Sequence, residues 1–563
     1  MGVADIFSWS PHITYPAFLL SILFPLLYKI YRRRLAFTDI PGPSGGHFLL
    51  GAHRSYSAER SSDDLQGHLP LLLRSPAAEE QRLLINDPKA LHYIMQTAGY
   101  GYVRTEDKKE PMRTLVGKGI LTVEGDDHRR QRRIMLPSFG SIQANTFVPS
   151  FAAKAAQVKP LLAMADMIAK SMPDDKGTVV DIPSWVARAT LGEGRVYDLY
   201  RPRSSLMLRS AAFDYQLNAL EDPTSNKLVS VYYNLFTKTR LTPTNFEILL
   251  DEAFALVPKT LMRWWNDHVP NARIVYMKQC REAAEDVARE LPAKYVDAAC
   301  CTLSRSPAIH LTVRANAAAQ PKARLDEDEV YAQLLTILLA GHETTANALS
   351  WAFFELAQQP DVQSRLRAEI RSVRASTSDA HLTAEAIHAM PYLNAVVKEI
   401  LRFHSPVYST SRTAMQDDVI PLERPIFDQQ GRPVFEIAVP KGTYVSISIA
   451  AYSRERALYG PNADLFNPER WLQEGSVSKH AGGGIYGNLL TFGSGHRGCL
   501  GWRFAVLEMS AFIIELVDRF EFSVSPDVAA RVYRGAAGVA IPMMKGEQEK
   551  GVQLPLHVKL APK

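Results

Sequence analysis

A glycine-rich segment near the C-terminus carries the most reactive side chain of the sequence. Residues 492–501 read FGSGHRGCLG, with four glycines around a single cysteine, Cys499. Glycine has no Cβ, so such a loop can pass very close to a flat ligand. Cys499 precedes a predicted apolar helix over residues 500–516, and the amides and dipole at a helix N-terminus stabilise a thiolate. The segment therefore predicts a thiolate beside a flat ligand.

Two further side chains of this loop suit the same ligand. Phe492 lies seven residues before the cysteine and can pack beside the sulfur, and Arg497 can pair with an acidic group of the ligand. A lone cysteine usually fills a core, but a core filler needs no glycine loop around it. The remaining cysteines are too few for a disulfide framework and favour a reducing compartment; they are Cys280, Cys300 and Cys301.

A second cluster lies midway along a long predicted helix. Ala340 and Gly341 add little bulk, so a planar cofactor and a small gas molecule can lie against the backbone. Inside a helix, the hydroxyl of Thr344 tends to bond back to the carbonyl four residues earlier. With Glu343 beside it, Thr344 can relay protons into a dry pocket. This spacing predicts a catalytic pair.

The same stretch also suggests a zinc protease, because His342 precedes Glu343. The H-E-x-x-H motif of those enzymes needs a second histidine at position 346. This chain has Ala346 there, so the pattern excludes a site of that kind.

A third set of residues indicates structural support. Glu399 and Arg402 are three residues apart on a helix that begins near Pro391, so they share a face. Most such pairs are solvated and contribute little to stability. Arg470 can convert this pair into a buried network. The predicted helix ends before Pro406.

The elements that position these clusters are mostly helices. The strongest covers residues 326–359, where Asp326 and Glu329 form a capping-box pattern and Pro360 stops the helix. The other expected elements are helices within residues 152–172 and 251–267, short strands at residues 83–88 and 444–449, and a loop at residues 315–324.

The N-terminal residues predict a membrane anchor. No charged residue lies between Asp5 and Lys29, and basic residues follow at once. A span needs roughly 20 mainly apolar residues, and the positive-inside rule then places the rest of the chain in the cytosol. We expect a signal anchor at residues 1–34, a proline/glycine hinge at residues 35–50 and a catalytic domain at residues 51–563. A buried core helix is the alternative for the apolar stretch.

The net charge is mildly basic. A formal charge of +5 suits an acidic protein partner or an anionic membrane surface. The sequence has no basic stripe with interleaved aromatic residues and no zinc-finger spacing, so we expect no nucleic-acid partner.

The three clusters resemble the motifs of one known family. Residues 492–501 match F-x-x-G-x-R-x-C-x-G at every fixed position, and residues 340–345 match A/G-G-x-D/E-T-T. Residues 399–402 match E-x-x-R. Residues 468–471 resemble P-E-R-F, with Trp471 in place of Phe. In this order, over nearly the whole chain after the hinge, the motifs resemble those of the cytochrome P450 family.

The resemblance implies the P450 fold, mainly α with small β-sheets (α+β), preceded by the anchor helix. It implies haem b as the cofactor, with Cys499 as the axial ligand of the iron. The resemblance makes Phe492, Arg497, Ala340 and Gly341 cofactor-binding, Glu343 and Thr344 catalytic, and Glu399, Arg402 and Arg470 structural supports of the cysteine loop.

The resemblance also indicates residues that hold the haem propionates. The family pattern W-x-x-x-R falls on His128 and Arg132, so a histidine stands in place of the tryptophan. Both rings offer an N–H donor, and the role can survive. Arg412, ten residues beyond Arg402, falls where the family often places another propionate partner. Taken alone, the arginine run at residues 129–133 is also typical of a solvated face.

The activity implied is that of a fungal microsomal monooxygenase, which oxidises a C–H or C=C bond with dioxygen. The chain has no nucleotide-binding glycine fingerprint, so electrons from NADPH must come through NADPH–cytochrome P450 reductase, with cytochrome b5 as a second donor. The expected location is the endoplasmic reticulum membrane, single-pass. The expected pocket segments, the loop leading to Ile120, the start of the long helix and residues 406–411, are mostly apolar. They favour a hydrophobic substrate, and the resemblance to fungal microsomal enzymes of the family implies a terpenoid or another secondary metabolite.

Two alternatives stay open at this point. One is a P450-type isomerase or dehydratase that needs neither oxygen nor a reductase, although the Glu343-Thr344 pair argues against it. The other is a membrane-tethered haem-binding protein without turnover. NADPH-dependent product formation separates all three. The stretch of residues 192–210 looks longer than the family usually has there, and no function is assigned to it.

Overall fold

The computed structural model describes most of the predicted catalytic domain. The described residues are 71–75, 80–153, 155–156, 178–191, 275, 277–279, 281–282, 315–316, 319–376, 382–428, 430–478, 483–536 and 538–562. The predicted anchor and hinge, the stretch 192–210, the predicted helix 251–267 and most of the predicted helix 152–172 lie outside them. Within these ranges, no helix combines the length and the hydrophobicity that crossing a bilayer requires.

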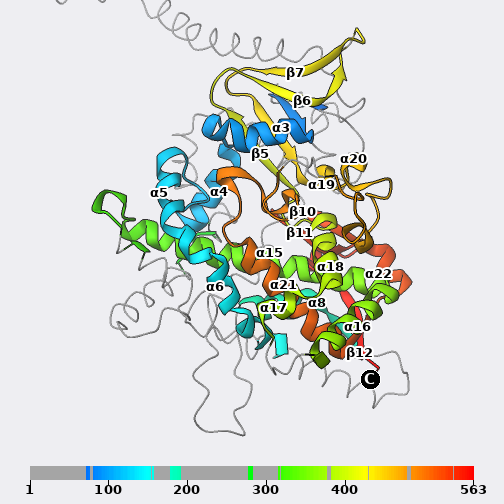
Figure 1. The fold of residues 1–563 in the computed structure, drawn as a ribbon. Helices are drawn as coiled ribbons and strands as arrows, with labels where there is room; N and C mark the ends of the chain where they lie inside the picture. The colour runs from blue at the N-terminus through cyan, green and yellow to red at the C-terminus, as the bar shows by residue number, and fades with distance from the viewer. Residues whose placement is uncertain are drawn as a thin grey trace, which may run out of the picture.

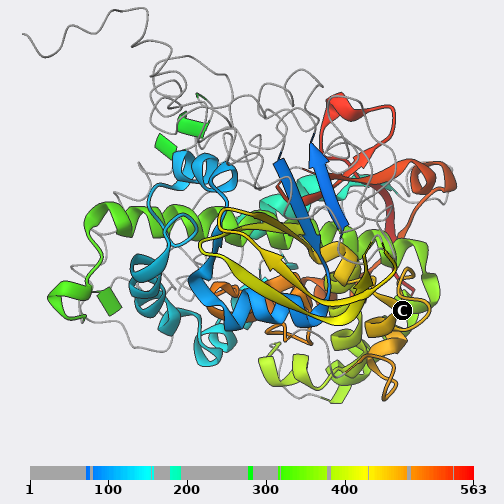
Figure 2. The same cartoon turned by 90° about the horizontal axis from the view of Figure 1, so that it is seen from above.

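The long helix of the sequence prediction is α15, Glu327–Gln358. The backbone N–H of Glu329 donates to Asp326 Oδ1 at 2.8 Å, and the N–H of Asp326 donates to Glu329 Oε2 at 3.1 Å, which completes the predicted capping box. The helix ends at Gln358, Gln359 is its C-cap, and the next helix begins with Pro360. Figure 2 shows α15, in green, crossing the molecule from one side to the other.

The described part of the chain is mainly helical (Figure 1). Besides α15, its α-helices are α3 Pro88–His92, α4 Glu106–Val116, α5 Gly125–Met135, α6 Ser141–Thr146, α8 Ile182–Leu191, α16 Pro360–Ser376, α17 Ala384–His388, α18 Pro391–Phe403, α19 Ile449–Tyr452, α20 Arg456–Tyr459, α21 Trp502–Arg519 and α22 Pro526–Arg531. The short turns used below are the 3₁₀ segments η3 Gly99–Gly101, η7 Pro468–Trp471, η8 Leu490–Phe492 and η9 Gly495–Arg497. The predicted loop at residues 315–324 contains one more such turn, Pro321–Ala323.

In the part of the chain that the structure describes, four small sheets accompany the helices. The largest has the order β1-β2-β8-β5-β3, in which β2 and β8 are parallel and the other neighbours antiparallel. Its strands are β1 Leu71–Ser75, β2 Glu80–Ile85, β3 Tyr102–Arg104, β5 Ser409–Ala414 and β8 Tyr444–Ser448. The others pair β6 Asp418–Phe427 with β7 Pro433–Val439, β10 Val532–Ala536 with β11 Ala540–Met544, and β12 Pro555–Leu560 with β4 Thr178–Asp181 and β9 Phe520–Ser523.

The core forms where α15 packs against α16, α18 and α21. Leu349 and Phe353 of α15, Leu393 of α18 and Ile513 of α21 are fully buried. Phe353 also contacts Phe522 of β9, with ring centroids 4.7 Å apart. The helices that carry the second and third clusters are therefore fixed in one apolar core, which holds their backbones in place.

The helix that follows the cysteine begins later than the sequence suggested. It starts at Trp502 and ends at Arg519, whereas the prediction placed it at residues 500–516. Leu500 and Gly501 form a turn, and Gly498 has an extended backbone (φ −58°, ψ 146°). Cys499 therefore lies in the loop itself, three residues before the first helical residue.

Candidate active site

The glycine loop folds back on itself around the cysteine. The N–H of Cys499 donates to the carbonyl of Phe492 at 2.8 Å, and that of Gly498 donates to the carbonyl of Gly495 at 3.0 Å. Gly495 has a positive φ of 61°, and a Cβ at this position would collide with the carbonyl of Met95. Only glycine meets both conditions. The loop therefore presents Cys499 from a backbone that other residues cannot adopt.

The Cys499 side chain is exposed, yet protein surrounds it. Burial raises the pKa of its thiol, whereas the amide of Gly501 and the charge of Arg132 lower it. Arg132 is fixed beside the loop, since its Nη1 donates to the carbonyl of Gly498 at 2.8 Å. A metal ion at the sulfur would deprotonate the thiol outright. The cysteine is accessible to a ligand and suits a metal centre.

The small residues of α15 leave open space at the middle of the helix. Ala340 and Gly341 are exposed, although Leu339 and His342 on either side are buried. A Cβ built on Gly341 would meet no atom within 4 Å. Thr344 Oγ1 donates to the carbonyl of Ala340 at 2.8 Å, as its place in a helix predicts. The helix remains α-helical through this point.

Glu343 is held in its neutral form. Burial raises the pKa of its carboxyl from 4.5 to about 8, against a smaller lowering by Asn347. His342 Nδ1 lies 3.6 Å from Glu343 Oε1, but burial lowers the pKa of His342 to about 4, so the imidazole carries no charge near neutral pH. At neutral pH Glu343 therefore holds a proton that it can release, one position before Thr344 in the helix.

This raised pKa has a measurable consequence for stability. Above about pH 4.5 the unfolded chain loses the Glu343 proton, whereas the folded protein keeps it up to about pH 8. The unfolded state then binds fewer protons, so stability falls as the pH rises through this window. In Glu343→Gln this pH-dependent contribution to stability is absent. We expect the melting temperature of the variant, relative to that of the wild type, to rise by a few degrees between about pH 5 and about pH 8. A pH-independent difference in thermal melts would contradict the assignment.

Two arginines meet across the main sheet. Arg104 of β3 lies directly opposite Arg412 of β5 in an antiparallel pair, an arrangement that like charges destabilise. Arg412 is buried and donates to Thr410 Oγ1 at 2.7 Å and to the carbonyl of Ser411 at 2.8 Å. Burial lowers the pKa of Arg104 to about 10 and that of Arg412 to about 9, and neighbouring arginines lower both further. Among the described residues no ion pair joins either guanidinium to a carboxylate, although the charge of Glu124 acts on both.

Arg497 of the cysteine loop joins the same group. It forms an ion pair with Glu124 and donates to the carbonyls of Ile120, at 3.1 Å, and Val123, at 2.6 Å. The backbone N–H of Arg104 also donates to Glu124, at 3.0 Å. The sequence prediction paired Arg497 with an acid of the ligand, and the structure shows a protein carboxylate beside it. The loop before α5 is thereby tied to the cysteine loop.

His128 and Arg132 lie one turn apart on α5, at the edge of this group. His128 is buried, and its Nδ1 lies 2.6 Å from the hydroxyl of Tyr100. Burial, and then the charges of Arg497 and Arg132, lower the pKa of His128 to about 2. The ring is therefore neutral, and it can donate one N–H to an anion.

The charge balance of this group fits haem. This group holds four guanidinium groups, those of Arg104, Arg132, Arg412 and Arg497, and among the described residues its one carboxylate is Glu124, which acts on all of them except Arg132. Buried charges without partners are strongly destabilising, and a ligand with two carboxylates would compensate them. Haem offers two propionates for the arginines and an iron for the thiolate of Cys499. The residues present therefore fit the cofactor that the sequence motifs imply.

Sequence reasoning missed four members of this group. Arg104, Glu124 and Tyr100 belong to no motif, and His496 fills a variable position of the cysteine-loop motif. Strand pairing and loop contacts bring all four to the site. The nearest signal in the sequence was Glu124, which immediately precedes Gly125, the first residue of α5.

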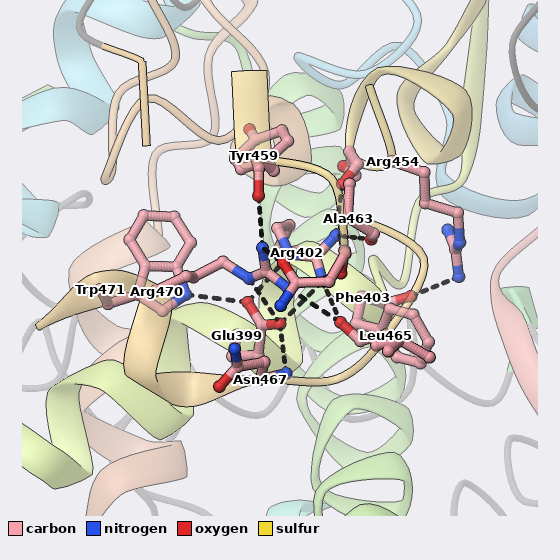
Figure 3. Close-up of polar contacts among 12 residues, drawn as sticks. Glu399, Arg402, Phe403, Arg454, Tyr459, Ala463, Leu465, Asn467, Arg470 and Trp471 are labelled. Atoms are coloured by element: carbon pink, nitrogen blue, oxygen red, sulfur yellow. Dashed lines mark hydrogen bonds and ion pairs between the residues drawn. The ribbon is translucent and has the colours of Figure 1, made fainter. Parts of the chain in front are cut away.

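The Glu399, Arg402 and Arg470 network forms as predicted (Figure 3). Arg402 Nε and Nη2 donate to the two oxygens of Glu399 at 2.9 and 2.7 Å, and Arg470 Nε donates to Glu399 Oε1 at 3.0 Å. Trp471, which stands where the family pattern has phenylalanine, also belongs to the network. Its Nε1–H donates to Glu399 Oε2 at 2.9 Å, and phenylalanine has no such donor. All three charged side chains are buried.

The network holds the segment that leads to the cysteine loop. Arg402 donates to the carbonyls of Ser453 and Ala463 at 2.6 Å, and to that of Leu465 at 2.9 Å. The link to the loop itself passes through α18, where the Thr491 hydroxyl donates to the carbonyl of Leu401 at 2.7 Å. The support of the cysteine loop is therefore indirect.

Comparison with known proteins decides the family. The cytochrome P450 family model matches residues 71–542, which include the glycine loop, the α15 cluster and the buried network. The chain belongs to the cytochrome P450 family. It is 31% identical over 539 residues to cytochrome P450 monooxygenase 205 of Postia placenta, with 92% of each chain covered. It is 29% identical over 540 residues to cytochrome P450 monooxygenase claO of Ampulloclitocybe clavipes, with 94% of each covered.

Membership of the P450 family confirms the resemblance and the fold class, mainly helical with small sheets. The chain is an oxidoreductase of the cytochrome P450 monooxygenase kind. Its cofactor is haem with a thiolate-ligated iron, and electrons from NADPH reach the haem through a redox partner, as in the rest of the family.

Proposed function

We propose that this P450 inserts one oxygen atom from dioxygen into a hydrophobic small molecule, with electrons from NADPH–cytochrome P450 reductase. The observation that carries the proposal is that the chain has both an accessible thiol, Cys499, and a neutral, proton-bearing carboxyl, Glu343, which is followed by the hydroxyl-bearing Thr344. Bound haem supplies dioxygen activation through its thiolate-ligated iron. Glu343 and Thr344 hold and deliver protons.

Other residues of this chain would bind the haem or support the residues that bind it. Arg132, His128 and Arg412 would hold the propionates, together with Arg104 and with Arg497 in its pair with Glu124. Phe492 would pack beside the sulfur, and Ala340 and Gly341 would let the porphyrin lie against α15. Glu399, Arg402 and Arg470 act through the backbone that they fix.

The substrate pocket is proposed from segments with few charges. Ile120 is buried in the loop that Arg497 holds. Val407 and Tyr408 are partly buried, and the carbonyl of the preceding Pro406 accepts from the N–H of Ala540 at 2.8 Å. This wall is apolar and aromatic, which favours a terpenoid or another hydrophobic secondary metabolite. Absorption spectra of the haem, recorded with terpenoids, sterols, fatty acids and aromatics, test the class.

The redox partner and the location belong to the same proposal. Arg129 and Arg133 are exposed on α5, the helix whose Arg132 holds the cysteine loop. Such basic residues suit an acidic partner, either the reductase or cytochrome b5. Residues 1–34 would anchor the chain in the endoplasmic reticulum membrane, with the catalytic domain in the cytosol. Microsomal fractionation of the full-length protein and of a variant without residues 1–34 tests the anchor, since only the full-length protein should stay with the membrane.

The test of the reaction is proton delivery. We expect Thr344→Ala to retain most NADPH consumption but to form much less oxidised product and to release more hydrogen peroxide. General acid–base assistance typically contributes about 10²–10⁴-fold, enough for this diversion to dominate. Thr345→Ala is the matched control, because its position is rotated by about 100° and its side chain is buried. Unchanged coupling of product to NADPH in Thr344→Ala would remove the proton-delivery role.

A further inference from the structure

Among the described residues, Tyr100 makes the single hydrogen bond of the His128 side chain. The Tyr100 hydroxyl and His128 Nδ1 are 2.6 Å apart, and the rings meet edge-on with centroids 5.7 Å apart. Tyr100 comes from η3, immediately before β3, whereas His128 comes from α5. Within the described part of the chain, the second ring nitrogen, Nε2, has no hydrogen-bond partner.

A neutral imidazole carries one proton, and its partner decides which nitrogen holds it. Burial lowers the pKa of His128 to about 2, so the ring stays neutral. Burial also raises the pKa of Tyr100, so the phenol keeps its proton and can donate it. A hydroxyl that donates to Nδ1 leaves the ring proton on Nε2. His128 then has an N–H donor on the nitrogen that no described residue contacts.

The positive charges around His128 favour an anion as the acceptor for its Nε2–H. Arg104, Arg132 and Arg497 all act on its charge, and their only carboxylate partner among the described residues of this group is Glu124. We propose that Tyr100 is a positioning residue, which fixes His128 as the Nε2–H tautomer so that it donates to a carboxylate of the porphyrin. This inference rests on the role given to His128 above. The family pattern has tryptophan at this position, whose N–H is fixed and needs no such partner.

Packing of the Tyr100 ring must be separated from the effect of its hydroxyl. The ring lies 4.2 Å from that of His496, and the guanidinium carbon of Arg129 lies 4.5 Å from its centroid. Tyr100→Phe keeps these ring contacts and removes the hydrogen bond alone. Tyr102→Phe is the matched control, since the buried Tyr102 hydroxyl acts on Asp418 and has no contact with His128 among the described residues.

The measurement is the rate at which haem leaves the full-length protein for an excess of apomyoglobin. We expect Tyr100→Phe to lose haem roughly 5–10-fold faster, the effect of about one hydrogen bond. The reduced carbon-monoxide band should keep its thiolate position, because Cys499 is untouched. Tyr102→Phe should lose haem at the wild-type rate. A rate for Tyr100→Phe within twofold of the wild type would overturn the proposal.

A second background tests the tautomer directly. In His128→Trp the N–H donor is fixed by the indole, so adding Tyr100→Phe should no longer accelerate haem loss. His128→Gln, whose amide also donates without a tautomer, repeats the test if the tryptophan variant fails to bind haem. The same acceleration in these backgrounds would show that the Tyr100 hydroxyl acts independently of His128 and would refute the inference. Absence of NADPH-dependent oxidation by the haem-loaded wild type would instead count against the proposed function.

Discussion

Cys499→Ser should abolish both the thiolate spectrum and the activity. Cys499 is the accessible thiol of the glycine loop, and Arg132 and the Gly501 amide favour its ionised form. A serine hydroxyl stays protonated near neutral pH and donates far less charge to iron than a thiolate. The reduced carbon-monoxide complex should therefore lose its red-shifted band, and product formation should fall to the level without enzyme.

The control for this experiment is Cys280→Ser, the same exchange at a cysteine outside every motif. It should keep the band and the activity. Far-ultraviolet circular dichroism should show that Cys499→Ser remains folded, because no core contact depends on the sulfur. A Cys499→Ser protein with the wild-type band would show that another residue binds the iron.

Arg402→Leu should prevent the formation of a stable folded protein. Arg402 is completely buried, and it donates to both oxygens of Glu399 and to three backbone carbonyls. Leucine would leave the buried Glu399 carboxylate with Arg470 as its one remaining ion-pair partner among the described residues, and would remove the donor from the carbonyls of Ser453 and Ala463. Breaking a buried pair typically costs about 3–5 kcal/mol, a large part of a total stability of about 5–15 kcal/mol. We expect aggregation and no carbon-monoxide band at any wavelength.

Arg365→Leu is the matched control for this change. Arg365 pairs with Glu469, the neighbour of Arg470, but its side chain is 53% exposed. Exposed pairs contribute about 0–1 kcal/mol, so this variant should fold, bind haem and melt close to the wild type. A soluble Arg402→Leu protein with a wild-type melting temperature would show that the network is dispensable.

Short-range patterns predicted the elements well. The capping box of Asp326 and Glu329 and the stop at Pro360 defined α15, because such signals act within a few residues. The glycine loop was legible for the same reason. The start of α21 was predicted too early, since apolar periodicity alone does not reveal that Leu500 and Gly501 form a turn.

Short-range sequence patterns could not predict the contacts between residues that are distant in the sequence. Arg104 faces Arg412 only because β3 pairs with β5 in one register. Glu124 meets Arg497, and Tyr100 meets His128, through the packing of separate loops against α5 and the cysteine loop. Trp471 looked like a simple replacement of phenylalanine, and only the position of the Glu399 carboxylate shows why an indole N–H is useful there.

The most direct test of the central claim is the origin of the oxygen atom in the product. The full-length protein, reconstituted with NADPH–cytochrome P450 reductase, NADPH and a compound that shifts the haem spectrum, is supplied with oxygen-18-labelled dioxygen in ordinary water. A monooxygenase should form a product that depends on NADPH and carries one labelled oxygen atom. A product that forms without NADPH or dioxygen would identify an isomerase or dehydratase, and no product with any compound that binds would identify a haem-binding protein without turnover.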